Sequence, residues 1–214
     1  GGFVINGASA GDRAGYRVSN AQDVNGDGLT DILVTAHLAA PNGGNSGAAF
    51  VVFGKKDTTV VELSAVQGGT GGFVMNGVGS GDRAGRSAST AGDVNGDGYS
   101  DLLVGAPTDD PNGDSSGAAF VVFGKTGTTA IDLSNVESGI GGFVINGASA
   151  GDQAGVTTAY AGDINGDGLD DLLVGAKFAD PGGRNDAGAS YVVFGKKDTA
   201  AIELSNVESG TGGF

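Results

Sequence analysis

The sequence repeats one unit three times, and this repetition limits the available folds more than any other feature. The heptapeptide Gly-Gly-Phe-Val-Ile-Asn-Gly at residues 1–7 returns at 141–147, and at 71–77 with Met75 in place of isoleucine. The period is 70 residues, and the third unit is one residue longer because its loop at 181–188 holds an extra residue. We therefore expect one domain of three repeats and the start of a fourth, at residues 1–70, 71–140, 141–211 and 212–214.

Each unit contains four short segments of apolar or small residues, separated by Gly, Asn, Asp and Ser. In the first unit they lie at Phe3–Ile5, Tyr16–Ala21, Ile32–Val34 and Phe50–Phe53. The last two are apolar at every position, which predicts strands covered on both faces. A further segment at 59–63 fits either a short helical turn or an extra strand. The pattern predicts an all-β fold of β-propeller blades with four antiparallel strands each, and three blades in this chain.

Composition excludes several other classes of protein. The 44 glycines would destabilise long helices, and only four prolines without a Gly-X-Y period exclude collagen. A formal net charge of −14 disfavours nucleic acid and anionic membrane surfaces as partners. The chain has no cysteine, and no apolar stretch is long enough for a membrane span.

A second motif, D-x-N-x-D-G-x-x-D, occurs once per unit, at 23–31, 93–101 and 163–171. Side-chain oxygens at positions 1, 3, 5 and 9 and the carbonyl at position 7 can converge on one cation, while glycine at position 6 permits the tight turn. About six or seven oxygen ligands suit Ca²⁺, whereas Mg²⁺ keeps more water. We expect about three Ca²⁺ ions per chain, held by Asp23, Asn25, Asp27, Leu29, Asp31, Asp93, Asn95, Asp97, Tyr99, Asp101, Asp163, Asn165, Asp167, Leu169 and Asp171.

Two other interpretations of this loop are weaker. An EF-hand or dockerin-type loop places its closing acid at position 12, but that position holds Val34, Val104 or Val174. Asp-Gly and Asn-Gly pairs also form plain hairpin turns without a metal, an alternative that three intact copies disfavour. Because the loop runs directly into an apolar β segment, the closing acid is expected at position 9.

At these residues the sequence resembles the FG-GAP repeat family, the blade type of the integrin α-subunit propeller and of many bacterial surface proteins. The second loop continues into Asp101–Pro107, which contains the Gly-Ala-Pro signature, whereas the other units depart from it at 35–37 and 175–177. The Phe-Gly half of the signature is replaced by Ala-Gly at 14–15 and in both copies. The resemblance covers the whole chain and looks like the long bacterial form of the repeat. It implies a propeller fold in a family of adhesins, lectin-like proteins and accessory modules of enzymes.

No set of side chains with catalytic spacing recurs in the units, so we predict that the chain is not an enzyme. His37 is the only histidine, and we expect it to be an exposed loop residue. The pair Asp109–Asp110 is expected in a solvated loop, and Asp12 and its copies at 82 and 152 in turns.

These observations favour a calcium-binding extracellular β-propeller module that acts in adhesion or as a structural, self-assembling surface protein. The location follows from calcium, because extracellular modules bind it at roughly 10⁻⁴–10⁻³ M. The alternative is a carbohydrate-binding or enzyme-associated propeller with a glycan or protein ligand. The four tyrosines lie at different points of the repeat, so no recurring sugar-binding platform is expected.

The two ends of the chain are expected to be complementary. Closed propellers have typically about four to eight blades, so three blades leave two end faces. Phe3–Ile5 resembles the outermost strand of a preceding blade, and the third unit stops at Phe214, where that strand would begin. Residues 1–7 of one chain could therefore complete the last blade of another. We favour a head-to-tail dimer that forms a six-bladed ring over a filament or further repeats of a longer chain.

Overall fold

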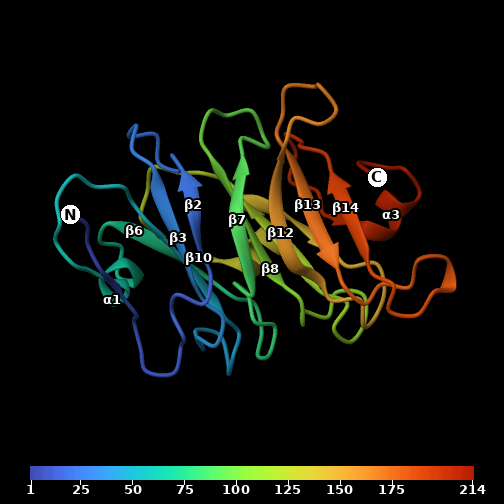
Figure 1. The fold of residues 1–214 in the computed structure, drawn as a ribbon, viewed down its shortest axis with the longest axis horizontal. Helices are drawn as coiled ribbons and strands as arrows, with labels where there is room; N and C mark the ends of the chain where they lie inside the picture. Colours follow the sequence, from blue (N-terminus) through green and yellow to red (C-terminus); the bar gives the residue numbers. More distant parts are fainter.

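The computed structural model describes residues 1–214, which form three blade-like β-sheets standing side by side (Figure 1). The first blade, from its inner edge outwards, consists of β2 (Val18–Gln22), β3 (Asp31–Ala36), β4 (Ala48–Val52) and β6 (Gly72–Asn76). The second consists of β7 (Ser87–Gly92), β8 (Asp101–Ala106), β9 (Ala118–Val122) and β11 (Gly142–Asn146). The third consists of β12 (Ala154–Gly162), β13 (Asp171–Ala176) and β14 (Ala189–Val193). The predicted all-β fold with three blades is confirmed.

The outermost strand of each complete blade comes from the following repeat. Strand β6 pairs antiparallel with β4, placing Val74 opposite Phe50, and β11 closes the second blade in the same way. In the third blade only Gly213 reaches this place, in a bridge with Val193. The copy of this strand in the first repeat is only β1 (Ile5–Asn6) and lies outside the three blade sheets. Each complete sheet therefore contains strands from two repeats.

The second glycine of the Gly-Gly-Phe motif makes this pairing possible. Gly72 has a φ of 153°, and a Cβ atom there would lie 1.9 Å from the carbonyl oxygen of Val51 on β4. Gly142 and Gly213 have the same geometry, with the same distance of 1.9 Å to the preceding blade. Only glycine allows the backbones to approach this closely.

The segment that begins at 59, for which the sequence allowed a helical turn or an extra strand, contains both a strand and a helix. The elements are β5 (Val61–Glu62) with α1 (Leu63–Gln67), β10 (Ile131–Asp132) with α2 (Leu133–Glu137), and β15 (Ile202–Glu203) with α3 (Leu204–Glu208). Each two-residue strand pairs in parallel with the first strand of its own repeat, so the two complete blades have five strands where four were predicted. The loop before β14 contains one further short helix, η1 (Pro181–Gly183).

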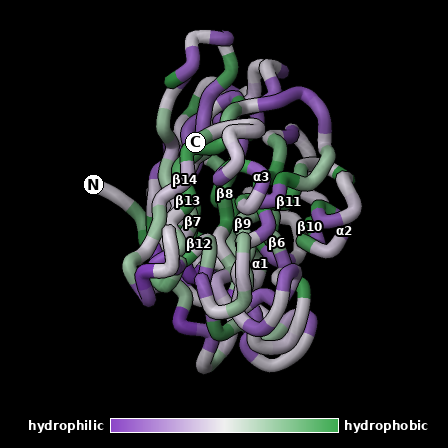
Figure 2. Tube along the Cα trace, turned by 90° about the vertical axis from the view of Figure 1, so that its right-hand side faces the viewer, coloured by the Kyte–Doolittle hydropathy of each residue, from purple (hydrophilic) through white to green (hydrophobic).

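The core consists of apolar side chains packed between neighbouring blades. Between the first two blades, Leu33 and Phe73 of one sheet pack with Leu102 and Phe120 of the other. An equivalent cluster joins the second and third blades. Figure 2 shows hydrophobic segments along the sheets and more hydrophilic ones in the loops at their ends. Burial on both faces explains why β4 and β9 are apolar at every position: β9 lies between two blades, and β4 lies between the second blade and α1.

The two end faces of this row of blades differ. On the first blade, the face away from the second blade is covered, because Phe50 and Val52 pack against Leu63 of α1. Side chains alternate between the faces of a strand, so the outward face of the third blade carries Ser190 and Phe214. Ser190 is exposed, and Phe214 is 64% exposed. The third blade therefore has an uncovered face that the first blade lacks.

Candidate functional site

The three acidic loops connect the first two strands of each blade and lie at the same end of the molecule. Neighbouring loops are hydrogen-bonded to each other: the Ser100 N–H donates to the Asp23 carbonyl over 3.1 Å, and the Asp170 N–H donates to the Asp93 carbonyl over 3.2 Å. The three predicted sites thus form a continuous row along the blades.

In the first loop, the carboxylate of Asp23 organises the turn. Its Oδ1 accepts hydrogen bonds from the N–H groups of Gly26 and Asp27, over 2.8 and 3.1 Å. Its Oδ2 accepts one from the Gly28 N–H over 2.8 Å. Asp93 and Asp163 bind the corresponding amides of the other two loops. The same turn is therefore built three times.

The side chains at positions 3 and 5 face the same turn. The Oδ1 of Asn25 accepts a hydrogen bond from the Asp27 N–H over 2.9 Å, and the Oδ1 of Asp27 accepts one from the Leu29 N–H over 2.8 Å. Asn25 also donates from Nδ2 to the Oδ2 of Asp27 over 3.1 Å. The side chains of two carboxylates and one amide therefore bind amides of the same turn in each loop, while the carbonyl groups of Leu29 and its copies follow directly along the backbone.

The acid at position 9 has a structural role that the sequence did not reveal. Asp31 is fully buried. One carboxylate oxygen accepts a hydrogen bond from the Val24 N–H over 2.9 Å, and the other from the Gly54 N–H over 2.8 Å. Asp101 and Asp171 make the same pair of contacts in their blades. This residue therefore fastens the acidic loop to the end of the third strand of its blade.

Burial raises the pKa of these anchoring carboxyl groups. For Asp101, desolvation is the largest cause, and repulsion from Asp97 and Asp93 adds to it, so that the pKa is about 7 although two amide hydrogen bonds lower it. The pKa of Asp31 is raised by burial and by the same two neighbours in its loop. The carboxylates at positions 1, 5 and 9 therefore lie close enough to repel each other, and a bound cation would relieve that repulsion.

The donor chemistry of each loop fits a hard cation, because all of its candidate ligand atoms are oxygens. The carboxylates are nevertheless occupied by amides of their own loop or, for Asp31 and its copies, also of the segment after the third strand. No group of three or more His, Cys, Asp or Glu side chains is arranged to hold a metal ion. A cation would have to replace some of these amide hydrogen bonds. Calcium binding at these residues stays a prediction.

At the opposite end of the first blade, the expectation for His37 is wrong. This residue follows β3 directly and is only 7% exposed. The ring of Tyr16 covers it, with the two ring centroids 3.8 Å apart. Burial, followed by the charges of Arg13 and Arg83, lowers the pKa of His37. Its Nδ1 is buried without a hydrogen-bond partner.

The expectation for Asp109 is also wrong. This residue is 8% exposed, because the loop after β8 folds back and the Gly117 N–H donates to the Asp109 carbonyl over 2.8 Å. Burial, and then the charges of Asp82 and Glu137, raise the pKa of Asp109 to about 7. The neighbouring Asp110 is exposed, as predicted. The carboxylate of Asp82 accepts a hydrogen bond from the Gly79 N–H over 2.5 Å, in keeping with its predicted place in a turn.

No side chain forms a hydrogen bond with His37, so the structure contains no histidine paired with a nucleophile or a carboxylate. None of the helices has the length and apolar character needed to cross a membrane.

Comparison with known proteins identifies the repeat. Residues 14–52, 84–122 and 155–193 match the FG-GAP repeat, and together these stretches make up more than half of the chain. Each stretch covers the first three strands of one blade, apart from Ala154 at the start of β12, and the acidic loop between the first two.

The similar proteins include integrin α subunits. The chain is 33% identical to integrin alpha-PS5 of Drosophila melanogaster over 83% of its own length and 16% of that protein. It is 29% identical to integrin alpha pat-2 of Caenorhabditis briggsae over 94% of its own length and 16% of the relative. It is 34% identical to phosphatidylinositol-glycan-specific phospholipase D of Bos taurus over 56% of its length and 14% of that protein. The chain thus spans a small part of each relative. Its three repeats, their blade architecture and these similarities show that it belongs to the FG-GAP repeat family and is an integrin α-like β-propeller.

Proposed function

We propose that this chain is a calcium-binding, extracellular β-propeller module that acts in adhesion. The observation that carries the proposal is the threefold repetition of one loop fold, in which two carboxylates and an amide face the same turn. Similarity to integrin α subunits supports a role in adhesion. Calcium is abundant outside cells, and loops of ordinary affinity fill there, which supports the location.

Calcium would be held by the same five positions in each loop. In the first loop these are the side chains of Asp23, Asn25, Asp27 and Asp31 and the carbonyl of Leu29. The cation would neutralise carboxylates that otherwise repel each other across the turn. Because it binds only the folded loop, each site would stabilise the protein by about 2.7 kcal/mol at a hundredfold excess over Kd.

Calorimetric titration with Ca²⁺ and thermal melts with and without chelator test this proposal. We expect binding at each loop and a lower Tm in chelator. The triple variant D27N/D97N/D167N removes one carboxylate per loop and should lose both effects, whereas Asp114→Asn, an exposed acid outside the loops, should keep them. An unchanged melt in chelator, together with no metal by elemental analysis, would overturn the proposal.

An enzyme-associated or carbohydrate-binding propeller is the second candidate. The similarity to phosphatidylinositol-glycan-specific phospholipase D favours it, because the name of that relative describes an enzyme. A glycan array distinguishes the two candidates. Saturable binding to defined glycans would favour the second, and its absence would favour adhesion to a protein ligand.

Self-association is the further part of the proposal, and the internal blade contacts support it. The Arg83 N–H donates to the Asn45 carbonyl over 3.1 Å, and the Ala84 N–H donates to the Ser46 carbonyl over 2.9 Å. The segment 151–155 docks on the second blade through the same bonds. Each Gly-Asp-x-Ala-Gly segment thus fits onto the blade before it.

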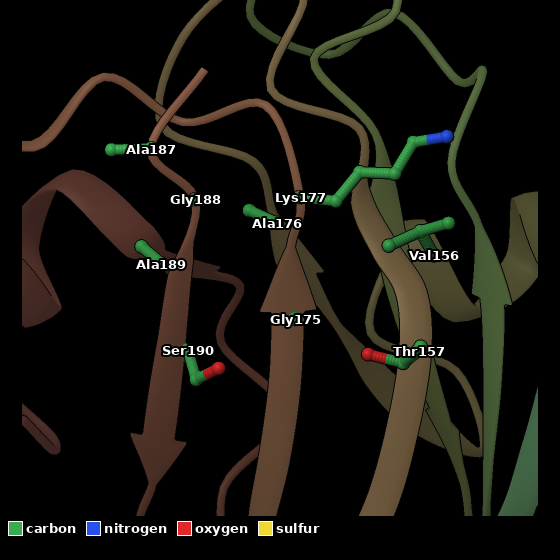
Figure 3. A pocket seen from close by; sticks show the side chains of 9 residues that line it. All are labelled: Val156, Thr157, Gly175, Ala176, Lys177, Ala187, Gly188, Ala189 and Ser190. Atoms are coloured by element: carbon green, nitrogen blue, oxygen red, sulfur yellow. The ribbon is translucent and has the colours of Figure 1, made fainter. Parts of the chain in front are cut away.

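The third blade has the surface onto which such a segment docks, but no segment of this chain lies on it. The carbonyl groups of Asp186 and Ala187, the counterparts of Asn45 and Ser46, accept no backbone hydrogen bond. Beside them lies a cavity of about 480 Å³, lined by Thr157, Gly175, Gly188 and their neighbours (Figure 3). In the internal contacts, the corresponding space holds the docked segment: a Cβ atom on Gly105, the counterpart of Gly175, would lie 2.0 Å from the Gly155 carbonyl oxygen.

The first repeat has a Gly-Asp-x-Ala-Gly segment that docks on no other blade of this chain. Arg13 has a φ of 55°, close to the 58° of Arg83 and the 54° of Gln153, so the Gly11–Gly15 segment has the docked conformation without a partner. The N–H groups of Arg13 and Ala14 make no backbone hydrogen bond. We infer that residues 11–15 of one copy dock in the cavity on the third blade of another.

The prediction that residues 1–7 of one copy complete the last blade of another needs one correction. The Val192 N–H and carbonyl are bonded to Phe214 of the same chain, over 2.7 and 3.0 Å. Residues 212–214 therefore already occupy the place that residues 1–3 of another copy would take. The segment that another copy would add begins at Val4, which is 58% exposed.

A further inference from the structure

Four of the five arginines of this acidic chain gather at one point, at the end of the first two blades opposite the acidic loops. They surround the rings of Tyr16 and His37, which pack against each other at an interplanar angle of 43°. The Cζ atom of Arg86 lies 4.8 Å from the centre of the Tyr16 ring, and that of Arg17 lies 5.8 Å from it. Arg13 and Arg83 act electrostatically on His37. A chain with a net charge of −14 thus concentrates its guanidinium groups around one aromatic pair.

None of these guanidinium groups has an anionic partner within the protein, although those of Arg17 and Arg86 lie over the Tyr16 ring. The two ion pairs of the structure are Lys55–Asp57 and Lys196–Asp198. No hydrogen bond is donated by a guanidinium of Arg13, Arg17, Arg83 or Arg86. Each guanidinium presents five N–H donors in a planar fork that matches the oxygen atoms of an anion. Like charges held together without a counterion are unfavourable, so the cluster is suited to an external anion.

The His37 ring adds a second, independent feature. Its Nδ1 is the only buried side-chain nitrogen atom that lacks a hydrogen-bond partner in the structure. Because Tyr16 packs on the ring, the imidazole cannot turn freely to find another partner. A buried polar atom without a partner is costly, and a ligand oxygen next to it would remove that cost.

A cavity of about 290 Å³ adjoins the cluster where the three inner strands meet. It is lined by Arg17 and Val18 of the first blade, Ser87 and Ala88 of the second, and Thr157 and Thr158 of the third. Ser87 donates its hydroxyl hydrogen to the Gly155 carbonyl over 2.8 Å and accepts one from Thr158 over 3.1 Å. The cavity offers a polar wall to the remainder of a ligand whose anionic group lies at the arginines.

The cluster is a property of the first two blades and is absent from the third repeat. At the positions of Tyr16, Arg17 and His37, the third repeat has Val156, Thr157 and Lys177, all shown in Figure 3. At the position of Arg13 and Arg83 it has Gln153. The arginines are therefore not required to build a blade.

We propose that Arg13, Arg17, Arg83 and Arg86, together with His37, form a binding site for the oxyanion group of a ligand, a planar carboxylate or a tetrahedral sulfate. The guanidinium groups bind the oxygen atoms, and the inner-strand cavity receives the rest of the ligand. The site lies at the opposite end of the blades from the acidic loops, so it does not depend on calcium.

The single histidine makes the test direct, because its imidazole resonances in an NMR spectrum can come only from His37. The full chain is titrated with sodium malonate, and separately with sodium sulfate, at low ionic strength. Sodium chloride at matched ionic strength serves as the reference. We expect saturable shifts with one or both anions and none with chloride, and the anion that binds more tightly identifies the preferred geometry.

The variants copy residues that the third repeat already uses. The double variant R83Q/R86V should retain the fold and weaken anion binding by at least roughly tenfold, the effect of losing one charge-assisted hydrogen bond. Arg17→Thr is a second, independent variant with the same expected direction. Arg184→Gln, far from the cluster in sequence, should bind as the unaltered chain does. Shifts that do not saturate, or equal binding by the cluster variants and Arg184→Gln, would overturn the proposal.

Discussion

The burial of Asp109 destabilises the folded protein, whereas its counterparts in the other repeats are buried without this penalty. Ala39 and Ala179 occupy the same position and are buried, 5% and 3% exposed. Asp109 is buried as well, and it faces Asp82 and Glu137, whose charges add to the effect of burial. A carboxylate in these surroundings opposes folding whenever it is ionised.

Replacing Asp109 with alanine should therefore stabilise the protein in a pH-dependent way. The pKa of Asp109 rises from its ordinary value of 3.8 to about 7 in the folded state. Between these values the folded state binds more protons than the unfolded chain, so the free energy of unfolding falls as pH rises. We expect Asp109→Ala to raise the free energy of unfolding by about 1–3 kcal/mol at pH 8, and not below pH 4.

Urea denaturation at a series of pH values measures this difference. Asp114→Ala, an exposed acid in the same loop, is the control and should change stability little at any pH. A loss of stability in Asp109→Ala at pH 8 would contradict the argument.

Residue-level environments were also where sequence reasoning failed. The side chains at positions 1, 3 and 5 of each loop are close in sequence, so their place on one turn could be predicted from spacing alone. The anchoring role of Asp31 could not, because its partner Gly54 lies 23 residues away, just beyond the end of β4. His37 was misjudged because Tyr16, which covers it, has no counterpart in the other repeats. The only signal in the sequence for the environment of His37 was that both Tyr16 and His37 differ from their counterparts in the other repeats.

Among the structural elements, the strands that recur as long apolar runs were predictable, and the two-residue strands were not. Strands β3 and β4 bury nearly every side chain, against the second blade on one face and near α1 on the other, so their apolar composition reveals them. Strands β5, β10 and β15 have one partner each and too few residues to show a pattern. The close approach of β6 to β4 is encoded in a single glycine.

Gly72→Ala should therefore destabilise the first blade. The new Cβ atom would meet the Val51 carbonyl oxygen at 1.9 Å, and the φ of 153° disfavours any side chain. We expect a loss of roughly 2–4 kcal/mol in the free energy of unfolding, from backbone strain and overpacking together. Gly2 is its counterpart in the first repeat, and a methyl group added there would meet nothing within 4 Å, so Gly2→Ala is the matched control. Equal denaturation midpoints for the two variants would refute this account.

At the scale of the whole molecule, the uncovered face of the third blade is where association between copies is expected. The head-to-tail proposal predicts a species of about twice the chain mass of 20.7 kDa by light scattering, because two chains complete a six-bladed ring. Ser190→Lys places a charge on the outward face and should shift the species to the single-chain mass while the fold is retained. Ser205→Lys, on an exposed position of α3, should leave the association unchanged. A folded species at 20.7 kDa for the unaltered chain would refute self-association.

Because the outer strand of each complete blade comes from the following repeat, the repeats are expected to unfold cooperatively. Unfolding the second repeat removes β6 from the first blade and exposes β4, so the free energy of one repeat cannot be separated from that of its neighbour. In a nearest-neighbour description of repeat proteins, this corresponds to a large coupling energy between units and a small intrinsic stability of each. The amides of β4 and β6 should therefore exchange with solvent in the same opening event, although they belong to different repeats.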